Sequence, residues 1–278
     1  MSSVTVAQPA EPGTGTRVRR RRVVESRLIP PLHAVGGFFE MCMDTFRATF
    51  RPPVQWREFF LMAWFVVRVA LVPTLLVAVP FTVLVVFTLN ILLVEFGAAD
   101  LSGAGAALGA VTQIGPLVTV LIVAGAAATA LCADLGARTI REEIDAMRVL
   151  GIDPIHRLVV PRVLASLVVA LLLNGLVVMI GLVGGFCFSV FIQNVTPGAF
   201  VSSLTLVTGL PEVVLSEIKA GMFGLVAGLV ACYRGLTVKG GPKSVGDAVN
   251  ETVVYAFMAL FAINVVLTAV GVKFGTGH

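Results

Sequence analysis

Charged side chains that could bind a partner or do chemistry are concentrated in one short stretch, 137–150. It reads Ala-Arg-Thr-Ile-Arg-Glu-Glu-Ile-Asp-Ala-Met-Arg-Val-Leu and lies between two long segments, 101–133 and 163–211, that contain no Asp, Glu, Lys or Arg. A charged helix between two apolar runs of membrane length must lie in water at the bilayer surface. The stretch is therefore either an ordinary connecting helix or a docking helix by which a membrane protein grips a soluble partner.

The spacing inside this stretch predicts one amphipathic helix. Thr139 and Glu142 fit a capping box at its start. Ile140, Ile144 and Met147 then form a single apolar stripe, and charged residues cover the remaining faces. Asp153-Pro154 is predicted to end this helix and to start the next one.

Catalytic and metal-binding patterns are missing from the sequence. The segment 235–244 resembles a phosphate loop, but Pro242 separates Gly241 from Lys243, whereas the loop requires a contiguous Gly-Lys-Ser/Thr. The four cysteines have no close-paired spacing and the three histidines are scattered. We therefore predict a chain that is not an enzyme and binds no metal or cofactor, so that any ATP, with its magnesium, is hydrolysed on another chain.

The composition is that of an integral membrane protein, with 57% hydrophobic residues, 13% charged residues and a mean hydropathy of +0.97. A soluble domain has about 25% charged residues. Basic residues cluster at 17–22, 138–162 and 234–243. Aromatic residues do not alternate with them, so they indicate membrane topology rather than a nucleic-acid surface.

The order of segments predicts an all-α integral membrane protein. A disordered basic tail over 1–27 precedes an interfacial amphipathic helix and elbow over 28–58, and a membrane domain follows over 59–278. Its five predicted spans are 59–94, 103–133, 158–192, 213–233 and 248–272, with an uncharged loop over 193–211. The positive-inside rule puts the N-terminus and the 138–151 helix in the cytoplasm and the C-terminus outside.

Few polar residues lie inside these spans. Apart from Arg162 and Glu251 at the ends of their spans, the charged ones are Arg68, and Glu217 and Lys219 near the outer start of the fourth span, which argues against an ion-coupled carrier. Uncharged polar groups at depth need partners inside a bundle. Asn90, Gln113, Asn174 and Asn264 are candidates for this reason, and the predicted lipid pocket comprises Asn90, Gln113, Ile114 and Leu117.

A long motif then points to a family. It runs Gly115-Pro-Leu-Val, Ala124-Gly125, Ala133-Asp-Leu-Gly-Ala-Arg138, Glu142-Glu-Ile-Asp-Ala-Met147, Leu150-Gly-Ile-Asp-Pro154 and Leu158-Val-Val-Pro-Arg162. It closely resembles the MlaE/YrbE permeases, the membrane subunits of ABC-type lipid transporters that work with MCE proteins. Cys232–Gly241 and 248–254 look like the actinobacterial YrbE branch, and most like an A-type mycobacterial subunit of an mce operon linked to fatty-acid and mycolic-acid uptake.

The resemblance implies a permease with one interfacial helix, five spans and a cytoplasmic coupling helix between the second and third spans. The implied ATPase-coupling residues are Arg138, Arg141, Glu142, Glu143, Ile144, Asp145, Ala146, Met147, Leu150 and Gly151. The implied partners are a paralogous B-type YrbE permease, a cytoplasmic ABC ATPase dimer, a hexamer of MCE proteins, membrane lipid and a fatty-acid-like cargo. The implied location is the inner (plasma) membrane, with a periplasmic C-terminus.

Two positions depart from the family pattern. Thr112-Gln113 stands where many members have Arg-Glu, and Ala126 stands where many have Arg after the Ala-Gly step. Both changes remove charge near the expected pocket, which favours a cargo less polar than a phospholipid. Two other functions remain open: a membrane scaffold that assembles MCE proteins without moving cargo, and an uncoupled lipid carrier.

Overall fold

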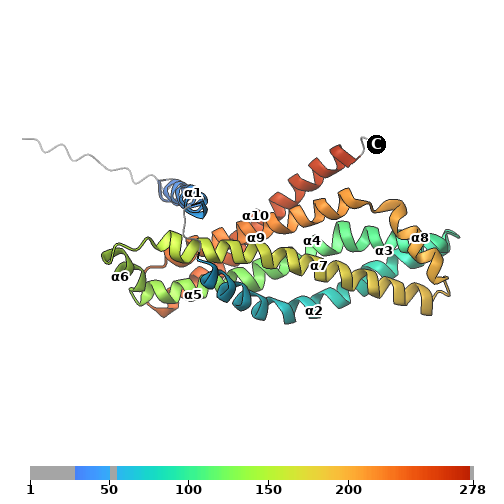
Figure 1. Cartoon of the computed structure of the whole chain (residues 1–278), viewed down its shortest axis with the longest axis horizontal. Coiled ribbons are helices and arrows are strands. Elements are labelled where there is room, and N and C mark those ends of the chain that lie inside the picture. Colours follow the sequence, from blue (N-terminus) through green and yellow to red (C-terminus); the bar gives the residue numbers. More distant parts are fainter. Residues whose placement is uncertain (1–28, 51–54, 276–278) are drawn as a thin grey trace, which may run out of the picture. The chain divides into compact units, whose positions relative to one another are not determined.

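The computed structural model describes residues 29–50 and 55–275, and within these ranges it contains helices and no strand. Residues 1–37 and the chain from Phe38 onward form two units, and the second carries the features described below. The predicted disordered tail, 1–27, lies outside the described residues. The helices (Figure 1) are α1 (Ile29–Thr49), α2 (Trp56–Glu95), η1 (Ala99–Leu101), α3 (Ser102–Ala107), η2 (Leu108–Ile114), α4 (Gly115–Ile122), η3 (Val123–Ala127), α5 (Ala128–Ile140), α6 (Glu143–Val149), η4 (Ile155–Val159), α7 (Val160–Phe191), α8 (Pro197–Val207), α9 (Leu210–Leu236) and α10 (Pro242–Gly275).

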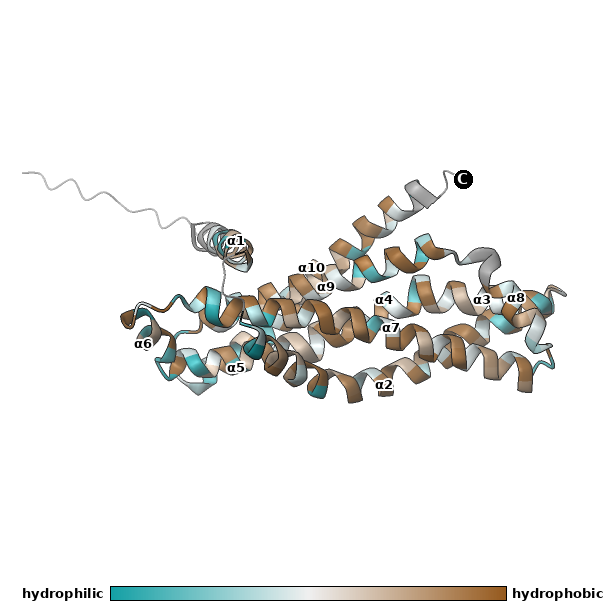
Figure 2. Cartoon of the chain, in the orientation of Figure 1, coloured by the Kyte–Doolittle hydropathy of each residue, from teal (hydrophilic) through white to brown (hydrophobic). Residues whose placement is uncertain are grey.

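Within the residues that the structure describes, five helical segments are long and apolar enough to cross a membrane. They are Trp56–Glu95, Ser102–Ile140, Ile155–Phe191, Leu210–Leu236 and Pro242–Gly271. Hydrophobic residues run along all of them in Figure 2, and hydrophilic residues gather around α5 and α6. The predicted all-α membrane fold with five spans is confirmed, and each span begins between one and six residues before its predicted start.

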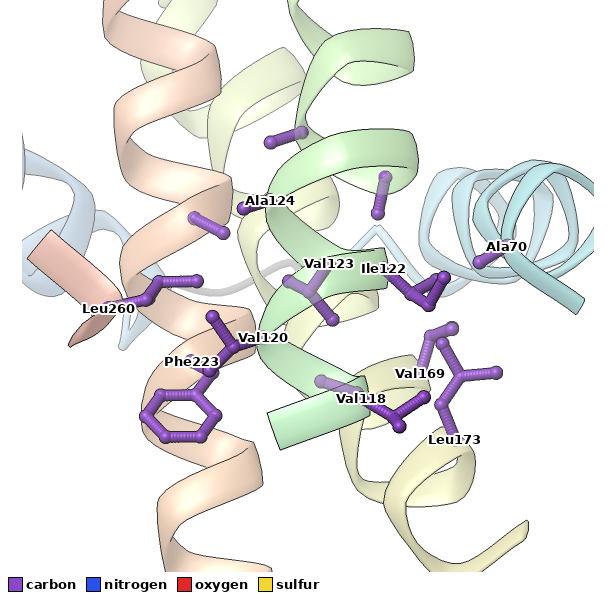
Figure 3. Close-up of a cluster of buried hydrophobic side chains, with 14 of the residues drawn as sticks. Ala70, Val118, Val120, Ile122, Val123, Ala124, Val169, Leu173, Phe223 and Leu260 are labelled. Carbon is purple, nitrogen blue, oxygen red and sulfur yellow. The ribbon is translucent and has the colours of Figure 1, made fainter. Parts of the chain in front are cut away.

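The second span forms the core of the bundle. It is a composite of α3, η2, α4, η3 and α5, in which η2 and η3 are π-helical. Figure 3 shows Val118, Val120 and Val123 of this span between Phe223 of α9 and Val169 of α7. The predicted bend at Gly115-Pro116 coincides with the end of η2, where the Gly115 N–H donates to the carbonyl of Ala110 in the i→i+5 pattern.

The first span, α2, packs through a stripe that repeats every four residues. Its buried members are Val66, Ala70, Thr74, Ala78, Thr82, Val86 and Asn90. Glycines of α7 lie opposite this stripe: a Cβ on Gly181 would come within 2.6 Å of Ala110 Cβ, and one on Gly185 would come within 2.7 Å of Ala106 Cβ. Because only glycine fits there, α2, α7 and the second span approach closely, as small residues allow in lipid.

The segment after α7 differs from its prediction. Residues 193–211 are predicted to be a loop, but α8 forms over Pro197–Val207. The Thr196 hydroxyl accepts a hydrogen bond from Ala199 N at 3.3 Å, and Pro197 occupies the first turn, where its missing N–H removes no helical hydrogen bond. An N-cap followed by proline is thus the local cause of this helix.

The part of α1 that belongs to the second unit has one buried side and one exposed aromatic side. Met41, Thr45 and Ala48 are buried against the bundle. Phe39 and Phe46 are 63% and 65% exposed on another side. An exposed aromatic stripe on a helix that also carries charges is what an interfacial position requires.

Candidate functional site

The charged stretch forms two helices, so the predicted single helix over 138–151 is wrong. Thr139 belongs to the last turn of α5, and its hydroxyl donates to the carbonyls of Leu135 and Gly235, each at 2.9 Å. The predicted capping box is therefore also wrong, because the Thr139 hydroxyl is already used. Glu142 adopts a left-handed conformation (φ 58°) that breaks the chain direction, and α6 begins at Glu143.

The C-terminal end of α6 has a well-defined local cause. Gly151 has φ +74°, its N–H donates to the carbonyl of Arg148, and the Ile152 N–H donates to the carbonyl of Met147. These two bonds form a Schellman motif, which satisfies the last carbonyls of the helix. The next helix begins at Pro154, with the Asp153 carboxylate accepting from Ile155 N at 2.9 Å, as the sequence predicts.

One side chain anchors α6 to the bundle. Ile144 is 3% exposed and packs in a cluster with Met41, Leu135, Leu158 and Leu229. Met147 packs against the same cluster while partly buried. The apolar side of α6 thus packs against residues of four other helical segments, α1, α5, η4 and α9.

The outward side of α6 carries ion pairs and an apolar tip. Arg141 Nε lies 3.0 Å from Glu143 Oε1, and Arg148 Nη1 lies 2.9 Å from Asp145 Oδ1. The tip consists of Val149, which is 88% exposed, and Leu150, which is 74% exposed. Of the remaining predicted coupling residues, Ala146 and Gly151 are exposed and Arg138 is half-buried at the end of α5.

A buried ion network lies at the base of this hairpin. Arg162, at the start of α7, is 2% exposed, and its guanidinium contacts the Asp134 carboxylate of α5. Arg162 Nη1 also donates to the carbonyl of Leu158 at 2.9 Å, and Arg138 Nε lies 3.5 Å from Asp134 Oδ1. The network joins the end of α5 to the start of α7, the long helices that precede and follow α6 in the chain.

Of the residues predicted to form a lipid pocket, Asn90 lies apart from the other three, which are neighbours in the second span. Asn90 is fully buried near the C-terminal end of α2 and donates to Ser189 Oγ at 3.0 Å. Ile114, which is also buried, lies about three helical turns away along the bundle, and Gln113 is exposed on η2. Leu117 is half-buried on α4.

Two apolar cavities lie among the described residues, away from the predicted pocket residues. One, of about 220 Å³, lies between the end of α1, the start of α2 and the start of α7, beside Trp56 and Pro161. The other, of about 370 Å³, lies between α2 and α7 beside Thr82 and Gly184. Neither is lined by Asn90, Gln113, Ile114 or Leu117.

A polar cluster inside the bundle centres on Asn174. Its amide nitrogen donates to Ser216 Oγ at 3.0 Å and to Glu217 Oε1 at 3.1 Å, and its oxygen lies 3.4 Å from Thr119 Oγ1. Asn264, the other candidate, is half-buried on α10, where its backbone carbonyl accepts from the Thr268 hydroxyl.

The whole membrane region matches one protein family. Residues 59–270 fit the family described as Permease MlaE. The chain belongs to the MlaE permease family.

Curated relatives of this MlaE-family chain come from bacteria and a plant. A probable ABC transporter permease of Synechocystis is 32% identical over 185 residues, which cover 66% of this chain and 70% of the relative. The intermembrane phospholipid transport system permease protein MlaE of Haemophilus influenzae is 29% identical over 67% of this chain and 71% of its own length. The chloroplastic protein TRIGALACTOSYLDIACYLGLYCEROL 1 of Arabidopsis thaliana is 29% identical, and the match spans 45% of that protein.

Sequence reasoning on this MlaE permease missed three features of the site. Arg162 is part of the family motif but had no assigned role, although it is the charged residue that immediately precedes the apolar run 163–211. The break at Glu142 had no local signal. The hydrogen bond between Asn174 and Glu217 joins α7 to α9, and the two residues lie 43 positions apart in the chain.

Proposed function

We propose that this chain is the membrane-spanning permease subunit of an ABC-type lipid transporter, driven by a separate cytoplasmic ATPase that docks on α6. The observation that carries the proposal is the form of α6. Its inward side is fixed through Ile144, and its outward tip presents Val149 and Leu150, which nothing in the described residues covers. Exposed aliphatic side chains among charged ones are typical of a protein-binding surface.

The family supports the transport part of this proposal, since relatives are named as ABC transporter permeases and one is named for intermembrane phospholipid transport. The proposed orientation places the N-terminus and α6 in the cytoplasm, in the inner membrane, with the C-terminus on the outer side. ATP and its magnesium then belong to the partner ATPase, since 235–244 does not have the contiguous phosphate-loop sequence.

We further propose a fatty-acid-like or mycolic-acid cargo, a B-type YrbE paralogue as second permease and a hexamer of MCE proteins on the outer side. The cargo follows from the uncharged side chains at Thr112, Gln113 and Ala126. The paralogue is supported by the separation of Asn90 from Gln113 and Leu117, because a pocket that includes all three needs walls from another chain. α10 exposes an apolar face, including Met258 and Val265, that suits a second membrane subunit or lipid.

The test replaces the exposed tip of α6 in the complex expressed with its partner chains. We expect Val149→Asp with Leu150→Asp to abolish co-purification of the ATPase and ATP-dependent uptake of a labelled fatty acid, while the permease still folds. The matched control is Lys239→Ser, an exposed residue after α9. Unchanged ATPase recovery and uptake in the tip variant would refute docking at α6. Normal ATPase recovery without ATP-dependent lipid movement in the wild type would favour the scaffold.

A further inference from the structure

One carboxylate of the membrane domain lies far from the ion pairs of the cytoplasmic end. Glu217 Oε1 accepts from the amide of Asn174, and Asn174 is fully buried near the midpoint of the span Ile155–Phe191. The sequence places Glu217 near the outer start of its span, but α9 begins at Leu210, opposite the interior part of α7. The carboxyl group therefore lies within the apolar part of the bundle.

Three helices hold this group in place. The Asn174 amide is fixed by Ser216 of α9 and lies beside Thr119 of α4, so its N–H is aimed at Glu217 before any ligand arrives. Gly175 of α7 lies beside the carboxylate, since a Cβ there would lie 3.8 Å from Oε1, in ordinary van der Waals contact. The fixed amide donor gives Glu217 a defined orientation at the seam of α7 and α9.

The second carboxylate oxygen, Oε2, has no hydrogen-bond donor in the part of the chain that the structure describes, and the side chain is partly exposed. No Lys or Arg in that part pairs with Glu217, because Lys219, on the same helix, donates instead to Thr268 Oγ1 at 2.9 Å. A carboxylate at this depth is costly unless it is hydrogen-bonded. A donor must therefore come from outside this chain.

The surroundings narrow the chemistry of that donor. Exposed aliphatic side chains flank the carboxylate, namely Leu172 on α7 and Val214 and Ile218 on α9. Such a surface accepts a hydrocarbon chain, whereas the carboxylate disfavours an anionic head group by like-charge repulsion. We propose that Glu217, oriented by Asn174, is a recognition point for the hydroxyl group of a lipid cargo. This proposal rests on the proposed transport function and adds a substrate class to it.

The test compares two probes that differ by one hydroxyl, stearic acid and 12-hydroxystearic acid. Binding to the purified complex is measured by native mass spectrometry, and ATP-dependent uptake is measured in proteoliposomes. We expect the wild type to bind the hydroxylated probe about tenfold more tightly, as one hydrogen bond to a charged group provides. Glu217→Leu should bring this ratio to about one, because it removes the carboxylate that accepts from the hydroxyl group of the hydroxylated probe.

Two further variants separate a lost hydrogen bond from a lost fold. Glu217→Gln keeps one acceptor oxygen and should retain part of the preference, and Ile218→Ala, on the neighbouring exposed position, should retain all of it. Equal ratios in the wild type and Glu217→Leu would overturn the inference. If uptake of stearic acid depends on ATP but no hydroxyl preference exists, the site fails and the transport function stands. If the preference exists and neither probe moves with ATP, the site stands and the transport function fails.

Discussion

At the end of the bundle that carries α6, charged groups join neighbouring helices, whereas in the middle of the bundle glycines do so. Arg162, Asp134 and Arg138 link the end of α5 to the start of α7. Farther along, α7 meets α9 where Gly224 and Gly228 lie against the backbone and side chain of Ser166. Electrostatic contacts tolerate water and small movements, but a glycine contact depends on close van der Waals fit.

This difference assigns separate tasks to the two regions. If an ATPase docks on α6 as proposed, the charged end would receive its movement and pass it on through Ile144 and the Arg162 network. The glycine-packed region would then follow as a rigid body, because its close contacts leave the helices little space in which to shift sideways. Three perturbations measure how far the two regions differ.

The largest expected effect follows from breaking the buried network. Asp134→Ala leaves the Arg162 guanidinium buried without its carboxylate and should cost about 3–5 kcal/mol of stability. The double variant Asp134→Leu with Arg162→Met removes both charges and should recover most of this loss. Thermal unfolding in detergent micelles measures both. A single variant as stable as the wild type would mean that this end does not depend on the ion network.

A smaller effect is expected in the glycine-packed region. Gly224→Ala places a Cβ 2.4 Å from the carbonyl oxygen of Ser166 and 2.7 Å from Ala170 Cβ. The overpacking should lower stability by about 1–3 kcal/mol, measured by the same unfolding assay. The control is Gly125→Ala, where an added Cβ meets nothing within 4 Å and stability should stay level or rise. Equal behaviour of the two variants would contradict close packing of α7 and α9.

The smallest effect on stability is expected at the surface of α6. Arg148→Ala removes the exposed pair with Asp145 and should change stability by only about 0.2–1 kcal/mol, less at high salt. Recovery of the partner ATPase, measured in parallel, should fall more than stability does if Arg148 contacts that partner. A loss of several kcal/mol would show that the charged end includes the outward side of α6.

The sequence predicts the spans well because hydropathy and the positive-inside rule act over whole segments. The ends of α2 and α7, for example, follow directly from where charge and proline begin. The split of the charged stretch at Glu142 is different. It depends on the Thr139 hydroxyl reaching the carbonyl of Gly235 on α9, a contact between residues 96 apart. The α8 helix, by contrast, has a local signal in Thr196-Pro197. The prediction of a loop over 193–211 relied on the absence of charge and did not use this signal.

The candidate site shows the same division. Ile144 and the charges of α6 could be assigned from spacing alone, because one helix determines which of them face inward. The prediction that Asn90 and Gln113 share a pocket is wrong because it required the axial alignment of α2 against η2. The hydrophobic periodicity of a single helix does not contain this alignment. The sequence shows that Glu217 is a charged residue within a span, but its depth in the membrane depends on where α9 begins relative to α7.

The four-residue repeat of α2 fixes how this helix can travel. Successive levels place Thr82 near Gly181, Val86 near Gly185 and Asn90 in a hydrogen bond with Ser189, so each level has its own size and polarity. Sliding α2 by one turn would set Val86 against the place of Thr82 and strand the Asn90 amide among aliphatic groups. The side chains therefore hold α2 and α7 in one axial register, and any transport movement must displace the two helices together as one rigid unit.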